Sequence, residues 1–320
     1  MPALASTGLD VHPLCLGGNV FGWTADEAAS CAVLDAYAAA GGNFVDTADA
    51  YSAWAPGNSG GESETILGNW MASRRTRDRM VVATKVGKLP ALRGLSAKTI
   101  RAAAEGSLRR LRTDRIDLYY AHLDDAATPL EETLAAFDAL VRAGKVRALG
   151  ASNYPAPRLA DALAIARRDG FARFAAVQDH HNLVHRSTWD GGLAELCRRE
   201  RLAFLPYYAL AQGFLTGKYR REGPASSAGG AVTAGDAASP RRDGARRHLD
   251  ARGERLLALL DRIAAAHATS LAAVALAWLR SQQDVVAPIA SARTAAQLAE
   301  LLPMATLTLT CEELQSLTAA

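Results

Sequence analysis

The sequence predicts an α/β protein of the (β/α)8 barrel class, and three observations support this fold. About eight short apolar segments alternate with about eight helical segments, a pattern typical of a parallel sheet covered by helices. No shift in composition marks a domain boundary, so we expect a single barrel domain over residues 1–320. The first strand is not followed by G-x-G-x-x-G, which a doubly wound dinucleotide-binding sheet would normally carry. The barrel is therefore favoured over the open sheet.

The strands are predicted from short runs of apolar residues. The chain begins with an expected β-hairpin, in which a turn at Thr7-Gly8 precedes a strand from Val11 to Gly18. Further strands are expected at residues 43–46, 80–85, 116–122, 146–152, 175–178, 203–207 and 285–290.

The helices are predicted from their start signals and from the helical spacing of apolar residues. Thr24 is the expected cap of the first helix, and Pro129 opens a later helix that has acidic residues in its first turn. Between residues 213 and 250 we expect a long loop rich in Gly, Ala, Ser and Arg. The helices are expected at residues 25–40, 62–74, 96–112, 128 onward, 155–169, 192–199, 254–267, 270–281, 294–301 and 310–317.

Composition excludes several classes of protein. Apolar residues make up 49% of the chain and charged residues 22%, and the mean hydropathy is -0.02, as in globular proteins. The formal net charge of +3 is small, so neither nucleic acid nor a membrane is an expected partner. We find no secretory signal and no apolar run of roughly 18 residues. The scattered cysteines, Cys15, Cys31, Cys197 and Cys311, are typical of reduced thiols in a cytoplasmic protein.

Polar side chains stand where the predicted strands end. In a barrel the carboxyl ends of the strands meet at one mouth, where the chemistry of this fold takes place. The polar residues expected there are Asp46 with Tyr51 close behind it, Lys85, His122, Ser152-Asn153, Gln178 and Tyr207. Any one of them alone would more often be structural, but together they indicate an active site.

These residues suggest proton donation to a carbonyl group. Tyr51 is the candidate acid, since a phenol beside a buried carboxylate can supply a proton. A buried ammonium at Lys85 is expected to lower the high pKa of that phenol, and Asp46 would hold and neutralise the lysine. His122 would bind the carbonyl oxygen and orient it toward Tyr51.

No metal site is expected. His180, His181 and His185 lie close together beside Asp179, but their spacing matches no recognised ligand motif and no cysteine joins them. They are interpreted as loop histidines.

Several motifs, in a fixed order, carry a resemblance to a known enzyme family. They are Gly42-Asn43-Phe44-Val45-Asp46-Thr47-Ala48 with Tyr51, Ala83-Thr84-Lys85, Asp117-Leu118-Tyr119-Tyr120-Ala121-His122, Gly144-Lys145-Val146-Arg147, Gly150-Ala151-Ser152-Asn153, Gln178 and Gly213-Phe214-Leu215-Thr216-Gly217-Lys218-Tyr219. With these motifs the chain resembles the aldo-keto reductases over essentially its whole length. The resemblance implies a catalytic tetrad of Asp46, Tyr51, Lys85 and His122. It also implies hydride transfer from a nicotinamide cofactor to an aldehyde or ketone.

The same resemblance implies which residues hold the cofactor. The nicotinamide carboxamide would be held by Ser152, Asn153 and Gln178, with Tyr207 stacked on the ring. The pyrophosphate would lie along Leu210, Ala211, Gly213, Leu215 and Lys218. The adenosine phosphate would contact Ser291, Arg293, Gln297 and Glu300. Because helix N-termini favour phosphate and Arg293 can pair with a 2′-phosphate, NADPH is preferred over NADH.

The long segment after Tyr219 would close over the bound cofactor, with its Gly and Ser residues supplying mobility. Its basic run, residues 241–255, is expected to be a solvated loop and helix start. The chain departs from the family's pattern at Ser291, Leu301, Tyr208-Ala209 and His181.

The substrate and two other functions stay open. Phe21, Trp23 and Trp54 are expected to form apolar walls of a pocket for a moderately bulky carbonyl compound, such as an aromatic aldehyde, a keto sugar or a steroid-like ketone. A homo-oligomer is possible. One alternative is a non-catalytic, regulatory relative similar to potassium-channel β subunits, which usually have asparagine where this chain has His122. The other is a lyase or aldolase that uses Lys85 as a Schiff-base nucleophile.

Overall fold

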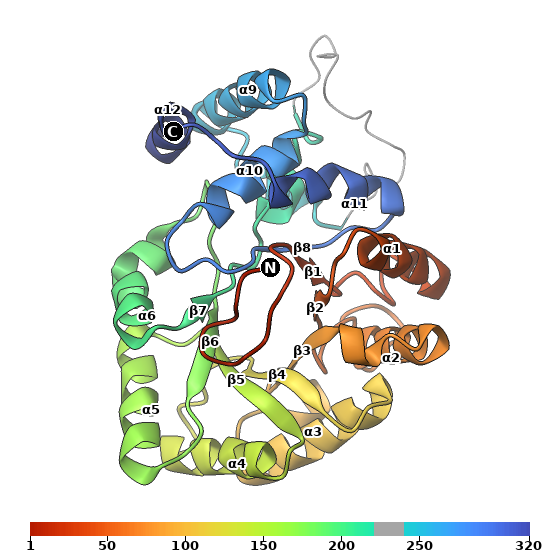
Figure 1. Ribbon diagram of the computed structural model, residues 1–320, viewed down its shortest axis with the longest axis vertical. Coiled ribbons are helices and arrows are strands. Elements are labelled where there is room, and N and C mark those ends of the chain that lie inside the picture. The colour runs from red at the N-terminus through yellow and green to blue at the C-terminus, as the bar shows by residue number, and fades with distance from the viewer. Residues whose placement is uncertain (221–239) are drawn as a thin grey trace.

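The chain folds into a closed barrel of parallel strands surrounded by helices (Figure 1). The computed structural model describes residues 1–220 and 240–320. Neighbouring strands pair in parallel in the order β7-β6-β5-β4-β3-β2-β1-β8. The strands are β1 (Cys15–Gly17), β2 (Phe44–Asp46), β3 (Val81–Val86), β4 (Ile116–Ala121), β5 (Val146–Ser152), β6 (Phe174–Gln178), β7 (Ala203–Phe204) and β8 (Ile289–Ala290).

The barrel closes where the residues before β8 run alongside β7. Phe204 N donates to Asp284 O at 2.8 Å, and Val286 N donates to Phe204 O at 2.9 Å. Ile289 N then donates to Pro206 O at 2.9 Å. Since β8 also pairs with β1, the sheet has no free edge. The predicted (β/α)8 barrel is confirmed.

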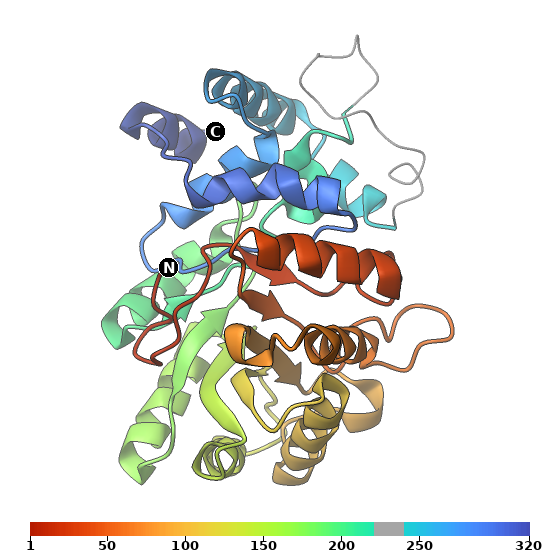
Figure 2. The ribbon, with the colours of Figure 1, turned by 45° about the vertical axis from the view of Figure 1, so that its right-hand side comes forward.

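Helices cover the outside of the barrel (Figure 2). Those that follow the strands are α1 (Glu27–Ala39), α2 (Glu62–Arg74), α3 (Ala97–Leu111), α4 (Leu130–Arg142), α5 (Ala156–Asp169), α6 (Ala194–Glu200), α10 (Leu271–Arg280) and α11 (Ala295–Leu301). Three more are α8 (Arg242–Arg246), α9 (Ala251–Ala266) and α12 (Cys311–Ala319). Both views show α9 and α12 near each other, on the outer side of α10. The short turns are η1 (Arg77–Arg79), η2 (Pro90–Leu92), η3 (Trp189–Leu193), η4 (Ala211–Thr216) and η5 (Leu302–Ala305).

The N-terminal hairpin covers one end of the barrel (Figure 1). Ala3 and Asp10 form an antiparallel bridge, and Leu4 N donates to Leu9 O at 2.8 Å. Leu4, Leu9 and Val11 belong to the same buried apolar cluster as inward-facing residues of all eight strands. The predicted hairpin is therefore present, and its apolar side chains complete the interior of the barrel.

The first helix begins later than predicted. Asp26, rather than Thr24, caps α1, because Asp26 Oδ1 accepts a hydrogen bond from Ala29 N at 2.8 Å. Both residue types cap helices well, so the local sequence did not distinguish them. Thr24 instead lines the cavity described below.

The last two strands are shorter than the predicted ranges 203–207 and 285–290. Each range contains a proline, Pro206 or Pro288, which has no N–H to donate to the sheet. The helix predicted at 192–199 also begins earlier, with the π-helical turn η3 that continues into α6.

The middle of the predicted cofactor-covering loop, residues 221–239, lies outside the described residues. The segments on either side of it, η4 and α8, contact each other. No single described helix is long and apolar enough to cross a membrane. Only α9 and α10 together reach that length and hydropathy, and they are bent by 94°.

His181 is a titratable group inside the apolar core. The residue is 2% exposed, and its ring lies among Trp189, Phe204 and Trp278. Neither ring nitrogen has a hydrogen-bond partner among the described residues. The pKa of His181 is lowered to about 4, mainly by burial and also by the nearby cationic groups.

We therefore predict that His181 makes the fold sensitive to acid. The unfolded chain binds the proton near pH 6.5 and the folded chain only near pH 4, so stability is complete above this window and falls as the pH drops through it. The loss reaches roughly 3 kcal/mol at the acidic end. Between pH 7.5 and pH 5, the Tm of His181→Phe should decrease by less than the Tm of the wild type. An equal loss of Tm in both proteins would contradict this assignment.

Candidate active site

The carboxyl ends of four strands carry polar residues that the sequence singles out. Asp46 is the last residue of β2 and Gln178 the last of β6. Lys85 lies one residue before the end of β3, and His122 directly follows β4. Closure of the barrel brings these side chains to one mouth, although Asp46 and Gln178 are 132 residues apart in the chain.

Lys85 and Asp46 form a buried ion pair that also holds Tyr51. Lys85 Nζ lies 2.7 Å from Asp46 Oδ2, and the two side chains are 0% and 2% exposed. Lys85 Nζ also donates to Thr47 O and to Tyr51 Oη, both at 2.8 Å. Tyr51 Oη donates to Asp46 Oδ2 at 2.9 Å, and Gln178 Nε2 donates to Asp46 Oδ1 at 2.8 Å. Every ammonium proton and both carboxylate oxygens therefore have partners.

Burial and the Asp46 carboxylate determine the protonation of Lys85 and Tyr51. Burial lowers the pKa of Lys85, and the negative charge of Asp46 opposes this by raising it. Burial raises the pKa of Tyr51 well above its usual value, and Asp46 raises it further. The expectation that Lys85 lowers the Tyr51 pKa is thus wrong for this structure, because Asp46 accepts the phenol's hydrogen bond and favours the protonated form. Tyr51 keeps its proton at neutral pH.

His122 is held as a neutral imidazole beside Tyr51. The residue is 9% exposed, and the centroids of the two rings lie 6.1 Å apart. Burial lowers the pKa of His122 well below its usual value, and the charges of Lys85 and Lys88 lower it further. Its Nδ1 is buried without a hydrogen-bond partner among the described residues. A neutral imidazole of this kind can donate one hydrogen bond and accept another.

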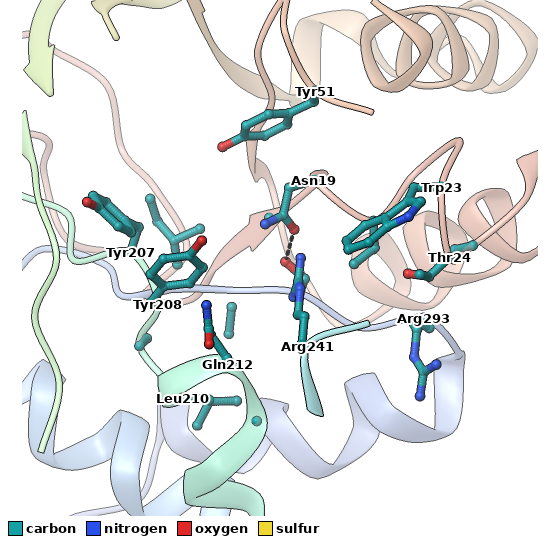
Figure 3. A pocket seen from close by; sticks show the side chains of 18 of the residues that line it. Asn19, Trp23, Thr24, Tyr51, Tyr207, Tyr208, Leu210, Gln212, Arg241 and Arg293 are labelled. Carbon is teal, nitrogen blue, oxygen red and sulfur yellow. Dashed lines mark hydrogen bonds between the residues drawn. The ribbon is translucent and has the colours of Figure 1, made fainter. Parts of the chain in front are cut away.

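A cavity of about 1410 Å³ opens next to this network (Figure 3). Figure 3 shows Tyr51 and Arg293 on opposite sides of it. The site residues predicted from the sequence that line this cavity are Asp46, Tyr51, His122, Ser152, Asn153, Gln178, Tyr207, Leu210, Gly213, Lys218, Ser291, Arg293, Gln297, Glu300, Trp23 and Trp54.

Four predicted site residues do not line the cavity. Lys85 is fully buried and is connected to the cavity through its bonds to Asp46 and Tyr51, which line it. Phe21, Ala211 and Leu215 are 0%, 3% and 0% exposed and belong to the apolar core cluster outside the barrel. The expectation that Phe21 forms a wall of the substrate pocket is therefore wrong, because its ring packs in that core.

Hydrogen bonds join the residues predicted to hold the nicotinamide. Asn153 Nδ2 donates to His122 O at 2.9 Å and to Ser152 Oγ at 3.0 Å. Tyr207 Oη donates to Asn153 Oδ1 at 2.8 Å. Asn153 has a φ of 57°, in the left-handed region that asparagine enters more readily than most residues. The turn after β5 thus holds the Asn153 side chain in place, and Asn153 in turn orients the Tyr207 hydroxyl.

Sequence reasoning did not assign several cavity residues to the site. Those labelled in Figure 3 are Asn19, Thr24, Tyr208, Gln212 and Arg241. Asn19 lies just after the end of β1. It could have been predicted in the same way as Asp46, as a polar residue at the carboxyl end of a strand. Its Oδ1 accepts a hydrogen bond from Ser291 Oγ at 2.6 Å. Arg241 was expected to be solvated, but its guanidinium lies over the ring of Trp23 at 5.5 Å.

The chemistry of the cavity suits a nicotinamide dinucleotide. Amide and hydroxyl groups gather beside the tetrad, where a carboxamide needs hydrogen bonds. Cationic side chains of Lys218, Arg241 and Arg293 line the rest of the cavity, where phosphates need positive charge. The donor set thus fits both ends of such a cofactor.

The chain is similar to known proteins over almost its whole length. Residues 13–320 match the model of the aldo/keto reductase family. The chain is 30% identical to norsolorinic acid reductase A of Aspergillus parasiticus, over 98% of this chain and 78% of that protein. It is 29% identical to aryl-alcohol dehydrogenase GME11368 of Pestalotiopsis microspora, over 98% of this chain and 79% of that protein. It is 33% identical to the uncharacterized oxidoreductase YrpG of Bacillus subtilis, with coverage of 98% and 93%. The chain therefore belongs to the aldo/keto reductase family, oxidoreductases that act on carbonyl groups and generally use nicotinamide cofactors.

Proposed function

We propose that this protein is an NADPH-dependent reductase that converts an aromatic aldehyde or ketone to the alcohol. The observation that carries the proposal is the network of Asp46, Lys85 and Tyr51 at the wall of a cavity that extends to Arg293. A bound nicotinamide would supply the hydride. All other requirements of the reaction fall to side chains of this chain.

Tyr51 is the proposed proton donor. Its phenol is protonated, because burial and Asp46 raise its pKa, and it lines the cavity. When negative charge develops on the substrate oxygen, the nearby ammonium of Lys85 would stabilise the phenolate that remains. Asp46 would keep the lysine charged and in place. In this proposal Lys85 assists after the proton leaves, rather than by acidifying the resting phenol.

His122 is the proposed orienting group. Because its imidazole is neutral, it can donate a hydrogen bond to the carbonyl oxygen without carrying a charge of its own. Its ring contacts that of Tyr51 in an edge-on geometry, so one substrate oxygen could face both groups. An intact histidine here supports an active reductase over the regulatory alternative.

The choice of NADPH rests on Arg293. The residue lines the end of the cavity away from Tyr51 (Figure 3). Its backbone N–H donates to Gln297 Oε1 at 2.9 Å, which fixes the main chain at the start of α11. A planar guanidinium there can pair with a 2′-phosphate through two parallel hydrogen bonds.

The choice of an aromatic substrate rests on Trp23 and Trp54. Their ring centroids lie 5.6 Å apart, and that of Trp54 lies 6.1 Å from that of Tyr51. Trp54 is 51% exposed, so it leaves apolar surface available at the mouth. The similarity to a protein named aryl-alcohol dehydrogenase supports the same substrate class.

Cofactor preference is tested by titrating the protein with NADPH and with NADH while tryptophan fluorescence is recorded. We predict tighter binding of NADPH. Arg293→Ala should raise the Kd of NADPH about tenfold and leave that of NADH nearly unchanged, because only NADPH carries the 2′-phosphate. Equal losses for both cofactors would assign Arg293 to another part of the dinucleotide, and absence of binding by either would remove the proposed function.

The role of Tyr51 is tested by Tyr51→Phe, which keeps the ring and removes the phenol proton. We predict that kcat falls roughly a hundredfold or more, while the Kd of NADPH changes little. Tyr154→Phe is the matched control, since this buried phenol lies outside the cavity and has no hydrogen-bond partner among the described residues. Retained turnover in Tyr51→Phe would exclude the phenol as the acid.

Substrate class is tested with Trp54→Ala. We predict that KM for a benzaldehyde derivative rises roughly three- to tenfold, from loss of an aromatic contact. The KM for a small aliphatic aldehyde such as propanal should stay nearly constant, because that substrate does not reach the rim. A parallel rise for both aldehydes would indicate a general distortion of the site.

A further inference from the structure

A turn after β6 places the imidazole rings of His180 and His185 in a stack with the ring of Tyr207. Asn182 Oδ1 accepts hydrogen bonds from Val184 N and His185 N, both at 2.9 Å, and so folds the chain back on itself. As a result the ring of His185 stacks on that of His180, with centroids 3.8 Å apart and planes 9° apart. His180 in turn stacks on Tyr207, with centroids 5.6 Å apart and planes 18° apart.

Asn182 connects this stack to Tyr208. Asn182 is fully buried, and because its Oδ1 accepts from two backbone N–H groups, its Nδ2 must face the other way. Nδ2 donates to Tyr208 O at 2.9 Å and lies 3.1 Å from His180 Nε2. Since an amide NH₂ can only donate, His180 Nε2 must carry a lone pair, and the ring proton must be on Nδ1.

Tyr208 needs this support because its backbone is strained. Its φ of 51° lies in the left-handed region, which a bulky side chain rarely adopts. Its ring is 40% exposed and lines the cavity next to Tyr207 (Figure 3). Such strain persists only where the surrounding structure maintains it, and it gathers at ligand sites. The bond from Asn182 Nδ2 is one of two that hold the Tyr208 carbonyl; the other comes from Ala211 N at 2.7 Å.

We propose that Asn182, His180 and His185 form a clamp that positions Tyr207 and Tyr208 for cofactor binding, and that the clamp is closed only while His180 is neutral. The proposal rests on the proposed nicotinamide site, where Tyr207 would stack on the ring. All three residues of the clamp act through the two tyrosines and are positioning residues. Protonated His180 would turn an N–H toward the Asn182 NH₂ group, and the two donors would move apart.

The groups around His180 keep it neutral in the ordinary range of pH. The pKa of His180 is lowered to about 4, mainly by burial and also by electrostatic interaction with His185 and His248. Asp179 accepts from the backbone N–H of His180 at 2.7 Å, and Lys88 acts on that carboxylate from the loop after β3. The clamp is therefore closed at neutral pH and opens only as the pH falls toward 4.

Asn182→Asp tests the clamp, because it replaces the donor that faces His180 Nε2 with an acceptor. The carboxylate still accepts from the two backbone N–H groups, but its second oxygen now faces Tyr208 O and His180 Nε2. The bond to Tyr208 is lost at every pH, and only the contact with His180 can be restored, by a donor at Nε2. The measurement is the Kd of NADP⁺, by tryptophan fluorescence, from pH 8 to pH 5.5, expressed as the ratio of variant to wild type. Titration of the 2′-phosphate near pH 6 cancels in this ratio. We expect the variant to bind about tenfold more weakly at pH 8, and the ratio to fall as acid protonates His180.

Further variants identify the titrating group. In Asn182→Asp combined with His180→Gln, the ratio should not change with pH, since no imidazole remains at position 180 to take up a proton. His267→Gln is the matched control, because His267 pairs with Glu313 away from the cavity, and it should leave the Kd unchanged. Circular dichroism establishes that each variant is folded.

A second pair of variants covers the case in which Asn182→Asp does not fold. His180→Lys carries a permanent charge and should weaken NADP⁺ binding about tenfold at every pH, whereas His180→Gln keeps an acceptor and should stay within about threefold of wild type. Equal affinities for these two variants, or a ratio for Asn182→Asp that does not depend on pH, would overturn the clamp. A wild-type protein that binds no NADP⁺ would instead overturn the proposed function.

Discussion

The rest of the site depends on the buried pair of Lys85 and Asp46. Bringing two charges into a barrel interior costs several kcal/mol for each ion, and only near-ideal geometry and complete hydrogen bonding offset that cost. Both conditions are met here. Lys85 has three acceptors for its three protons, and Asp46 accepts from Lys85, Tyr51 and Gln178. Because Tyr51 is one of those partners, the same bonds that make the charges tolerable also fix the phenol at the edge of the cavity.

The barrel supplies this geometry. The parallel pairing of β2 and β3 places Asp46 opposite Ala83, and this brings Asp46 close to Lys85, which lies 39 residues later in the chain. The bond from Gln178 to Asp46 spans the barrel mouth and requires closure, which β8 provides by running beside both β1 and β7. The network is thus a consequence of topology, and the hairpin at the opposite end adds its apolar side chains to the interior of the barrel.

The aromatic side of the cavity is held in a different way. Tyr207 is fixed at its hydroxyl by Asn153 and at its ring face by His180, so neighbouring turns after β5 and β6 both act on it. Tyr208 keeps a strained backbone through bonds to its carbonyl. A buried ion pair therefore lies on one side of the cavity, and on the other lie rings whose positions depend, in our proposal, on the neutral imidazole of His180. The proposed acid, Tyr51, and the tyrosines expected to contact the cofactor are therefore positioned by different interactions.

The sequence alone determined the barrel, the boundaries of several helices and the residues at the strand ends. Alternating apolar segments require a covered parallel sheet, and polar residues such as Asp46 and His122 interrupt them at one consistent position. The family resemblance, carried by contiguous motifs, agreed with the family match. Helix α2 and strand β5 occupy the predicted ranges, because their signals are local.

Tertiary structure alone decided the rest. Phe21 and Trp23 are both aromatic residues that follow the first strand, so the sequence does not distinguish their roles. Only packing shows that Phe21 belongs to the core and Trp23 to the cavity. Nothing local indicates that Arg241 lies over Trp23, or that the ring of His180 stacks on that of His185. The raised pKa of Tyr51 also follows from its burial and from its hydrogen bond to Asp46, which only the fold establishes. Local patterns determine which residues are available, whereas burial and distance determine their charge and their neighbours.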